Sequence, residues 1–152
     1  MSYYKKIFIS TMFVIVALTV AYSVDAYTEV TKVNDKVIRL HVIANSDESY
    51  DQQLKYKVRN KIIEKFDNEF NDILSKGESE NVIIEKLDEI RNEASMVVKE
   101  EGYGYEVNVY YGNFKFPRKI YDDILLPAGY YDSVRIEIGK AEGKNWWCVM
   151  FP

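Results

Sequence analysis

The feature that most constrains the fold is a change of hydrophobic period near Gly102. Before it, apolar residues recur every three or four positions, which is typical of amphipathic helices; after it, apolar and polar residues alternate, which is typical of strands. One helix is predicted to begin at Ser49 and to end before a break at residues 75–77, and a second to cover about 80–100. Two helices with a short polar connection are expected to form an antiparallel pair. The apolar stripes of the two helices comprise Leu54, Val58, Ile62, Phe66 and Phe70, and then Ile83, Leu87, Ile90, Ala94 and Val97.

Four strands are predicted around this pair, over residues 37–44, 105–111, 134–138 and 145–151. The first is rich in β-branched residues and largely apolar on both faces, which favours an inner position in a sheet. The last two strands are separated by a loop of about five residues and are expected to pair as a hairpin.

The order strand, helix, helix, strands predicts an α+β fold, in which the antiparallel helix pair packs on one face of a mostly antiparallel sheet. A chain of 152 residues has room for one small domain. We expect a signal peptide or N-terminal membrane anchor over residues 1–26, a linker over 27–36 and a single exported domain over 37–152.

The N-terminus has the order of an export signal. Lys5 and Lys6 are followed by an apolar stretch over residues 7–20 and then by the small residues Ala21, Ser23 and Ala26. This arrangement is typical of a signal peptide. Cleavage after Ser23 and cleavage after Ala26 both remain open. The stretch is short for a spanning helix, but such helices can have as few as about 17 apolar residues, so retention as an uncleaved anchor is the alternative. In each case the body lies outside the cytoplasm and meets the membrane only through this segment.

Composition excludes several classes of function. The net charge of -4 disfavours a nucleic-acid partner, whose phosphates require a basic surface. The single cysteine, Cys148, excludes a disulfide framework within these residues, and the single histidine, His41, excludes a site with several histidine ligands. We expect no cofactor.

Candidate acid–base residues are few. Asp122 and Asp123 are adjacent, and neighbours on a strand point to opposite faces, which disfavours a shared catalytic site. His41 lies in an apolar strand, and no serine elbow surrounds a candidate nucleophile. We therefore predict no catalytic residue and no enzymatic activity.

The acidic residues at the start of the first helix do not form a calcium loop. They lack the ligand spacing and the central glycine of such a loop, and acidic side chains are common at helix N-termini. We predict no metal site at this group, which comprises Asp47, Glu48 and Asp51.

Aromatic residues are concentrated in the last third of the chain. Tyrosine and tryptophan are favoured in the core and also at protein interfaces. Adjacent tryptophans on a strand point to opposite faces, so one can enter the core while the other faces outward; burial of both between sheet and helices remains the alternative. The candidate partner-binding residues are Trp146, Trp147, Tyr130 and Tyr131.

Three parts of the chain resemble the stage II sporulation protein R family. They are residues 38–59, residues 126–139 with the sequence Leu-Pro-Ala-Gly-Tyr-Tyr at their start, and residues 143–152 with the sequence Asn-Trp-Trp-Cys. The residues that carry the resemblance include Arg39, His41, Asn45, Ser46, Asp47, Pro127, Gly129, Asn145 and Cys148.

The resemblance implies a signalling protein of sporulation. Such a protein is secreted from the forespore into the space between the forespore and mother-cell membranes, where it activates the membrane aspartic protease that processes the sigma-E precursor. The resemblance carries no catalytic residues with it. It also implies further residues beyond Pro152 that include a second cysteine, so no disulfide of Cys148 is expected within the present sequence. An exported hydrolase or a cell-wall binding module is the alternative function.

Overall fold

The computed structural model describes residues 3–70, 75–121 and 124–151, which form two units divided after Val33. The first unit is helix α1, which runs from Tyr3 to Asn34 where the body begins. Its Tyr3–Val24 portion has a mean hydropathy of 2.3 and no buried residues, and it is long and apolar enough to cross a membrane. The helix includes residues 27–34, most of the stretch that the sequence suggested as a linker.

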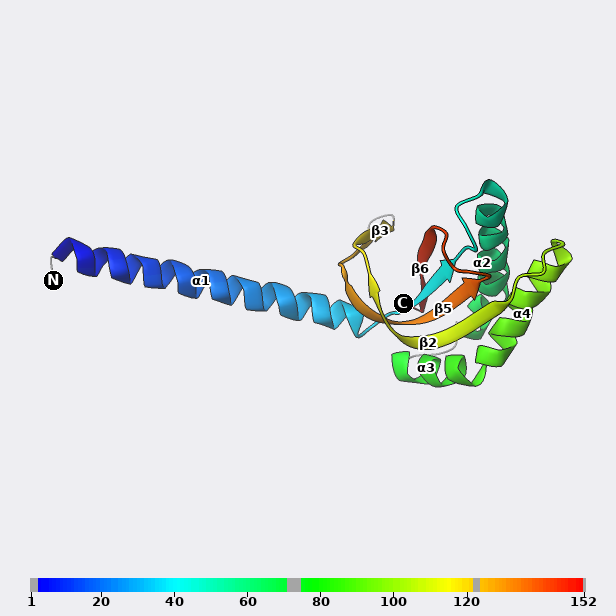
Figure 1. The fold of residues 1–152 in the computed structure, drawn as a ribbon. Coiled ribbons are helices and arrows are strands. Elements are labelled where there is room, and N and C mark those ends of the chain that lie inside the picture. Colours follow the sequence, from blue (N-terminus) through cyan, green and yellow to red (C-terminus); the bar gives the residue numbers. More distant parts are fainter. Residues whose placement is uncertain (1–2, 71–74, 122–123, 152) are drawn as a thin grey trace. The chain divides into compact units, whose positions relative to one another are not determined.

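The body begins with a strand, continues with helices and ends with strands, which confirms the predicted α+β class (Figure 1). Its elements are β1 (Ile38–Ile43), α2 (Ser49–Phe70), α3 (Lys76–Glu85), α4 (Leu87–Glu100), β2 (Val107–Phe116), β3 (Lys119–Tyr121), β4 (Ile124–Leu126), β5 (Gly129–Ile138) and β6 (Asn145–Phe151).

The main sheet has the strand order β2-β5-β1-β6, and β3 pairs with β4 in a separate two-stranded sheet. The β1 strand occupies an inner position, as its two apolar faces predicted. It runs parallel to β5 and antiparallel to β6, while β2 is antiparallel to β5. The sheet is therefore mixed, with antiparallel pairing in the majority.

The predicted hairpin of the last two strands is wrong, because β1 lies between β5 and β6. Residues 139–144 connect the two strands by crossing the end of β1. Two strand spacings amount to about 10 Å, which six residues span with ease. The connection is held there by two backbone hydrogen bonds, from Glu142 N to Asn45 O at 3.2 Å and from Gly143 N to Ala44 O at 2.9 Å. The central place goes to β1 because both of its faces are buried.

The helix pair has the predicted antiparallel arrangement. Lys57 near the start of α2 contacts Glu101 after the end of α4, whereas Lys65 further along α2 contacts Glu93 and Glu89 nearer the start of α4. The residue numbers of the partners on α4 therefore decrease as the residue numbers on α2 increase, which shows that the two helices run antiparallel. The residues spaced four apart on α2, from Leu54 to Phe66, are all buried, which confirms the stripe; Phe70 lies outside the residues whose side chains the structure describes.

The second predicted helix begins earlier than expected and is divided in two. Ser75 caps α3 by accepting a hydrogen bond from the backbone N–H of Glu78, which moves the start from about 80 to Lys76. At Lys86 the backbone N–H is shared between the carbonyls of Val82 and Ile83, and a new helix starts at Leu87.

The helices cover one face of the sheet. Alternate residues of β1 and β5 pack against α2, α3 and α4 in one apolar core. From β1 these residues are Ile38, Leu40 and Val42, and from β5 they are Val134, Ile136 and Ile138.

Candidate functional site

The sheet face opposite the helices carries several of the residues that the sequence had singled out. Arg39 and His41 alternate along β1 with the core residues and are also buried. Ser133 of β5 pairs in register with Arg39 and is buried as well. This second face is thus a polar and aromatic layer beneath the sheet, and we call it the Arg39 layer.

Arg39 is fully buried, and the structure shows no ion pair for it among the described residues. Its guanidinium carbon lies 4.2 Å from the ring centre of Phe116 and 4.9 Å from that of Tyr131. Nη2 donates to the Tyr121 hydroxyl at 2.8 Å, and the Tyr121 hydroxyl donates in turn to the Trp147 carbonyl at 2.7 Å. The faces of aromatic rings attract a desolvated cation, so Phe116 and Tyr131 stabilise the buried charge of Arg39.

His41 is held between aromatic groups in a neutral form. Its ring stacks on Trp147 at 3.8 Å between centroids, with 17° between the planes. Nε2 lies 2.9 Å from Oδ1 of Asn145. Burial lowers the pKa of His41 to about 4; the hydrogen bond to Asn145 opposes this change, and the charges of Arg135 and Arg39 add to it. At neutral pH the ring therefore packs as an uncharged group.

The adjacent tryptophans lie on opposite faces of β6, as the strand geometry predicted, and both are half-buried. Trp146 packs against the core, with its ring 5.4 Å from that of Tyr56 and beneath the guanidinium of Arg59 at 4.2 Å. Trp147 lies in the Arg39 layer, 4.5 Å from Phe116. Neither side chain is fully buried or fully exposed. Trp146 is partly covered by helix α2, and Trp147 is partly covered by the aromatic residues of the Arg39 layer.

The two tyrosines differ in accessibility. Tyr131 is fully buried, and its hydroxyl donates to the carbonyl of Pro127 at 2.7 Å. Tyr130 is 61% exposed. Only Tyr130 of this pair is available to a partner on the surface.

The backbone of Gly129 approaches Asn34, whose amide nitrogen would lie 2.6 Å from a Cβ at that position.

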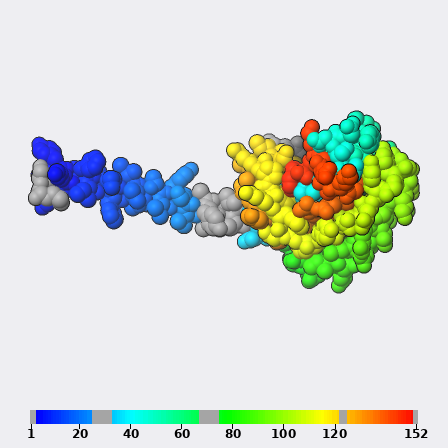
Figure 2. Space-filling view, in the orientation of Figure 1, coloured from blue at the N-terminus to red at the C-terminus, as the bar shows by residue number. Residues whose placement is uncertain are grey.

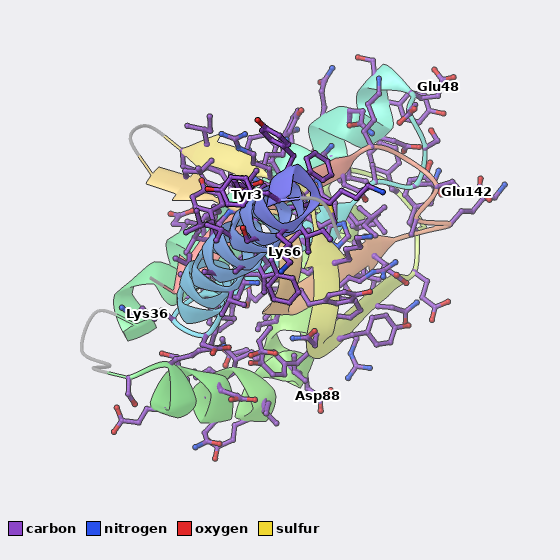
Figure 3. All side chains as sticks on the ribbon, turned by 90° about the vertical axis from the view of Figure 1, so that its left-hand side faces the viewer. Tyr3, Lys6, Lys36, Glu48, Asp88 and Glu142 are labelled. Atoms are coloured by element: carbon purple, nitrogen blue, oxygen red, sulfur yellow. The ribbon has the colours of Figure 1, made fainter. Side chains whose placement is uncertain are left out.

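Residues 45–47 join two loops at one end of the body. Asn45 Oδ1 accepts from the backbone N–H of Lys140, and Asp47 Oδ1 accepts from that of Lys144. Ser46 donates to Asp51 Oδ2 at 2.6 Å. Figure 3 shows the side chains of the labelled Glu48 and Glu142 at this same end. The group therefore positions the 139–144 connection.

Gly143 belongs to this junction. A Cβ at Gly143 would lie 2.2 Å from the carbonyl oxygen of Ser46, so the close approach of the two loops requires glycine. The three signature residues at positions 45–47 thus have a structural role in these contacts.

Cys148 is half-buried on the helix-facing side of β6. Its thiol lies 3.8 Å from the carbonyl oxygen of Leu40, and burial raises its pKa to about 11. Since the thiolate is the nucleophilic form, this environment keeps the side chain unreactive.

Sequence reasoning missed two members of the layer, Phe116 and Tyr121. Phe116 is the last residue of β2, and Tyr121 is the last residue of β3, a strand with too few residues for a period to be visible. Asp122 and Asp123, the adjacent acids weighed above, lie outside the described residues. Within the described part of the chain, no three metal-ligating side chains come together. At neutral pH the imidazole of His41 stays uncharged, so it contributes to the layer by packing.

Comparison with known proteins identifies the sequence family. The sequence profile described as Stage II sporulation protein R (spore_II_R) matches residues 34–152. The chain is 39% identical over 118 residues to "Stage II sporulation protein R" of Bacillus subtilis (strain 168), which covers 78% of this chain and 53% of the relative. It thus spans about half the length of that curated relative. No solved structure matches. The extent of both matches shows that the chain belongs to the stage II sporulation protein R family.

Proposed function

We propose that this protein is an exported signal of sporulation that binds and activates the membrane aspartic protease processing the sigma-E precursor. The observation that carries the proposal is the family match over residues 34–152. The apolar helix at Tyr3–Val24 supports it, because a signal that acts outside the forespore cytoplasm needs an export segment. The body would then act in the space between the forespore and mother-cell membranes.

The environments of the two most reactive side chains support a role in binding. His41 has an amide as its hydrogen-bond partner and a lowered pKa, and Cys148 has a raised pKa. A general base needs a pKa near the working pH, and a cysteine nucleophile needs a lowered one. Both side chains are suited to packing, and we propose that the protein acts without catalysis.

The proposed contact surface is the β6 edge of the sheet. Among the described residues this strand pairs only with β1 in the main sheet, and it carries Trp146 and Trp147, both half-buried. Half-buried tryptophans on rigid strands are frequent anchors of interfaces, where truncation can cost about 2 kcal/mol or more of binding free energy.

The test is to replace Trp147 by alanine and to measure both binding to the non-cytoplasmic region of the protease and cleavage of the sigma-E precursor. Tyr110→Ala is a matched control, because Tyr110 is a half-exposed aromatic on β2, the other edge strand. We expect Trp147→Ala to weaken binding at least about ten-fold, as a loss of 1.4 kcal/mol or more requires, and Tyr110→Ala to leave it unchanged.

Thermal unfolding of each variant separates loss of contact from loss of fold. Normal binding by a folded Trp147→Ala protein would remove β6 from the interface. Hydrolysis of peptidoglycan by the purified chain would instead favour an exported hydrolase and contradict the proposal.

A further inference from the structure

The small sheet of β3 and β4 has an apolar face that is exposed in the described part of the chain. Tyr121 reaches the Arg39 layer through its hydroxyl, and Leu126 is buried, so these two side chains hold the hairpin to the body. Ile120 and Leu125 are directly opposite one another in register. They share a face and are 65% and 47% exposed. An antiparallel sheet with one solvated face normally carries polar residues there.

A third exposed apolar residue lies where the chain enters the body. Asn34 donates from Nδ2 to the carbonyl of Tyr130 at 3.1 Å, and Lys76 lies 3.5 Å from the Asn34 carbonyl. The first residue of the body is therefore fixed beside Tyr130, and only residues 127–129 separate β4 from that point. Figure 2 shows the yellow atoms around residues 115–121 at the surface of the body.

Chain connectivity brings this end of the body close to any membrane that α1 enters. The portion of α1 that could cross a bilayer ends at Val24, and only residues 25–34 lie between it and the body. Ten residues span at most about 35 Å. A connection this short keeps the body within reach of the bilayer, so a weak contact through a small patch suffices.

We propose that Ile120, Leu125 and Tyr130, the hairpin patch, contact the bilayer surface and hold the body against the membrane to which its N-terminal helix leads. Aliphatic side chains insert at the boundary of headgroups and acyl chains, and tyrosine is enriched at that depth. The proposal goes beyond protease activation and does not depend on it.

The contact is apolar in origin. Residues 115–126 contain three basic and two acidic side chains, so the segment has a net charge of only +1. Attraction of one charge to anionic lipid contributes about 1 kcal/mol and is screened by salt. The hairpin patch should therefore bind zwitterionic bilayers, and high salt should leave the contact in place.

The experiment uses the full chain reconstituted into phosphatidylcholine vesicles that contain a lipid with a nitroxide quencher at the headgroup boundary. An environment-sensitive fluorophore is attached through Ile120→Cys, or through Met96→Cys on α4 as the control, since Met96 is 43% exposed. The raised pKa of Cys148 keeps its thiol slow to react at neutral pH, and wild-type protein treated in the same way gives the blank.

We expect the label at residue 120 to be quenched several-fold more strongly than the label at residue 96, with and without high salt. Leu125→Asp should abolish this quenching without changing the unfolding temperature, because Leu125 is on the exposed face. Equal quenching at residues 120 and 96 would overturn the proposal, as would quenching that high salt removes. Quenching that appears only after the protease is added would assign the hairpin patch to a protein contact and would also overturn it. Protease activation is measured separately, so either proposal can fail alone.

Discussion

Acidification should destabilise this protein through His41, the single histidine of the chain. Its pKa falls from an ordinary value of 6.5 to about 4 in the folded state. Between these pH values the unfolded state binds a proton that the folded state excludes. The contribution of His41 to the free energy of unfolding is therefore fully present above pH 6.5 and decreases as the pH falls towards about 4. At 1.36 kcal/mol for each pH unit, the loss amounts to about 3 kcal/mol.

Two measurements check this. The imidazole signal of a chain with one histidine is unambiguous in an NMR titration, which should give a pKa well below 6.5. Urea unfolding in detergent micelles should be measured against pH for the wild type and for His41→Gln. The carboxylates are the same in both proteins, so the difference between the two curves isolates His41.

The wild type should lose about 3 kcal/mol more than His41→Gln on acidification. Parallel curves, or an imidazole that titrates near 6.5, would show that the stacked ring of His41 is hydrated and would refute the description of the Arg39 layer as a dry layer.

Two further outcomes follow from the core and from β6. Phe66 is 1% exposed, so Phe66→Ala should lower the free energy of unfolding by about 3–5 kcal/mol. Ile63→Ala, on the outer side of α2, should change that free energy by about 0.5 kcal/mol or less. Both values are measured by urea unfolding followed by circular dichroism, and equal effects would contradict the packing of the helix pair. The pKa of the Cys148 thiol is about 11 in the folded protein in place of 9.0, so the folded protein holds less of the reactive thiolate. At pH 8 iodoacetamide should therefore alkylate Cys148 about a hundred-fold more slowly in the folded than in the urea-unfolded protein. Similar rates would show that the thiol is solvated.

Local periodicity allowed the elements of the main sheet and the helix pair to be predicted. The spacing of Leu54, Val58, Ile62 and Phe66 identified the buried stripe of α2, because side chains four apart lie on one side of a helix whatever it packs against. The alternation along β1 showed that both faces would be covered, and adjacent tryptophans could only lie on opposite faces of β6.

The neighbours of each strand lay beyond the reach of the same argument. Nothing in residues 134–151 distinguishes a hairpin from two strands separated by β1, since a six-residue connection permits both. The start of α3 was also missed, because its cap at Ser75 depends on a single hydrogen bond to the backbone of Glu78.

The sequence by itself determined the types of element, their order and the pattern of faces on each, since these depend on interactions within a few residues of the chain. Only the tertiary structure decided that Tyr131 is buried and Tyr130 exposed, and that Arg39 is surrounded by Phe116 and Tyr121. Those outcomes depend on which distant segments cover a face, and the free energy that selects among such arrangements comes from burial summed over the whole domain, which no local pattern records.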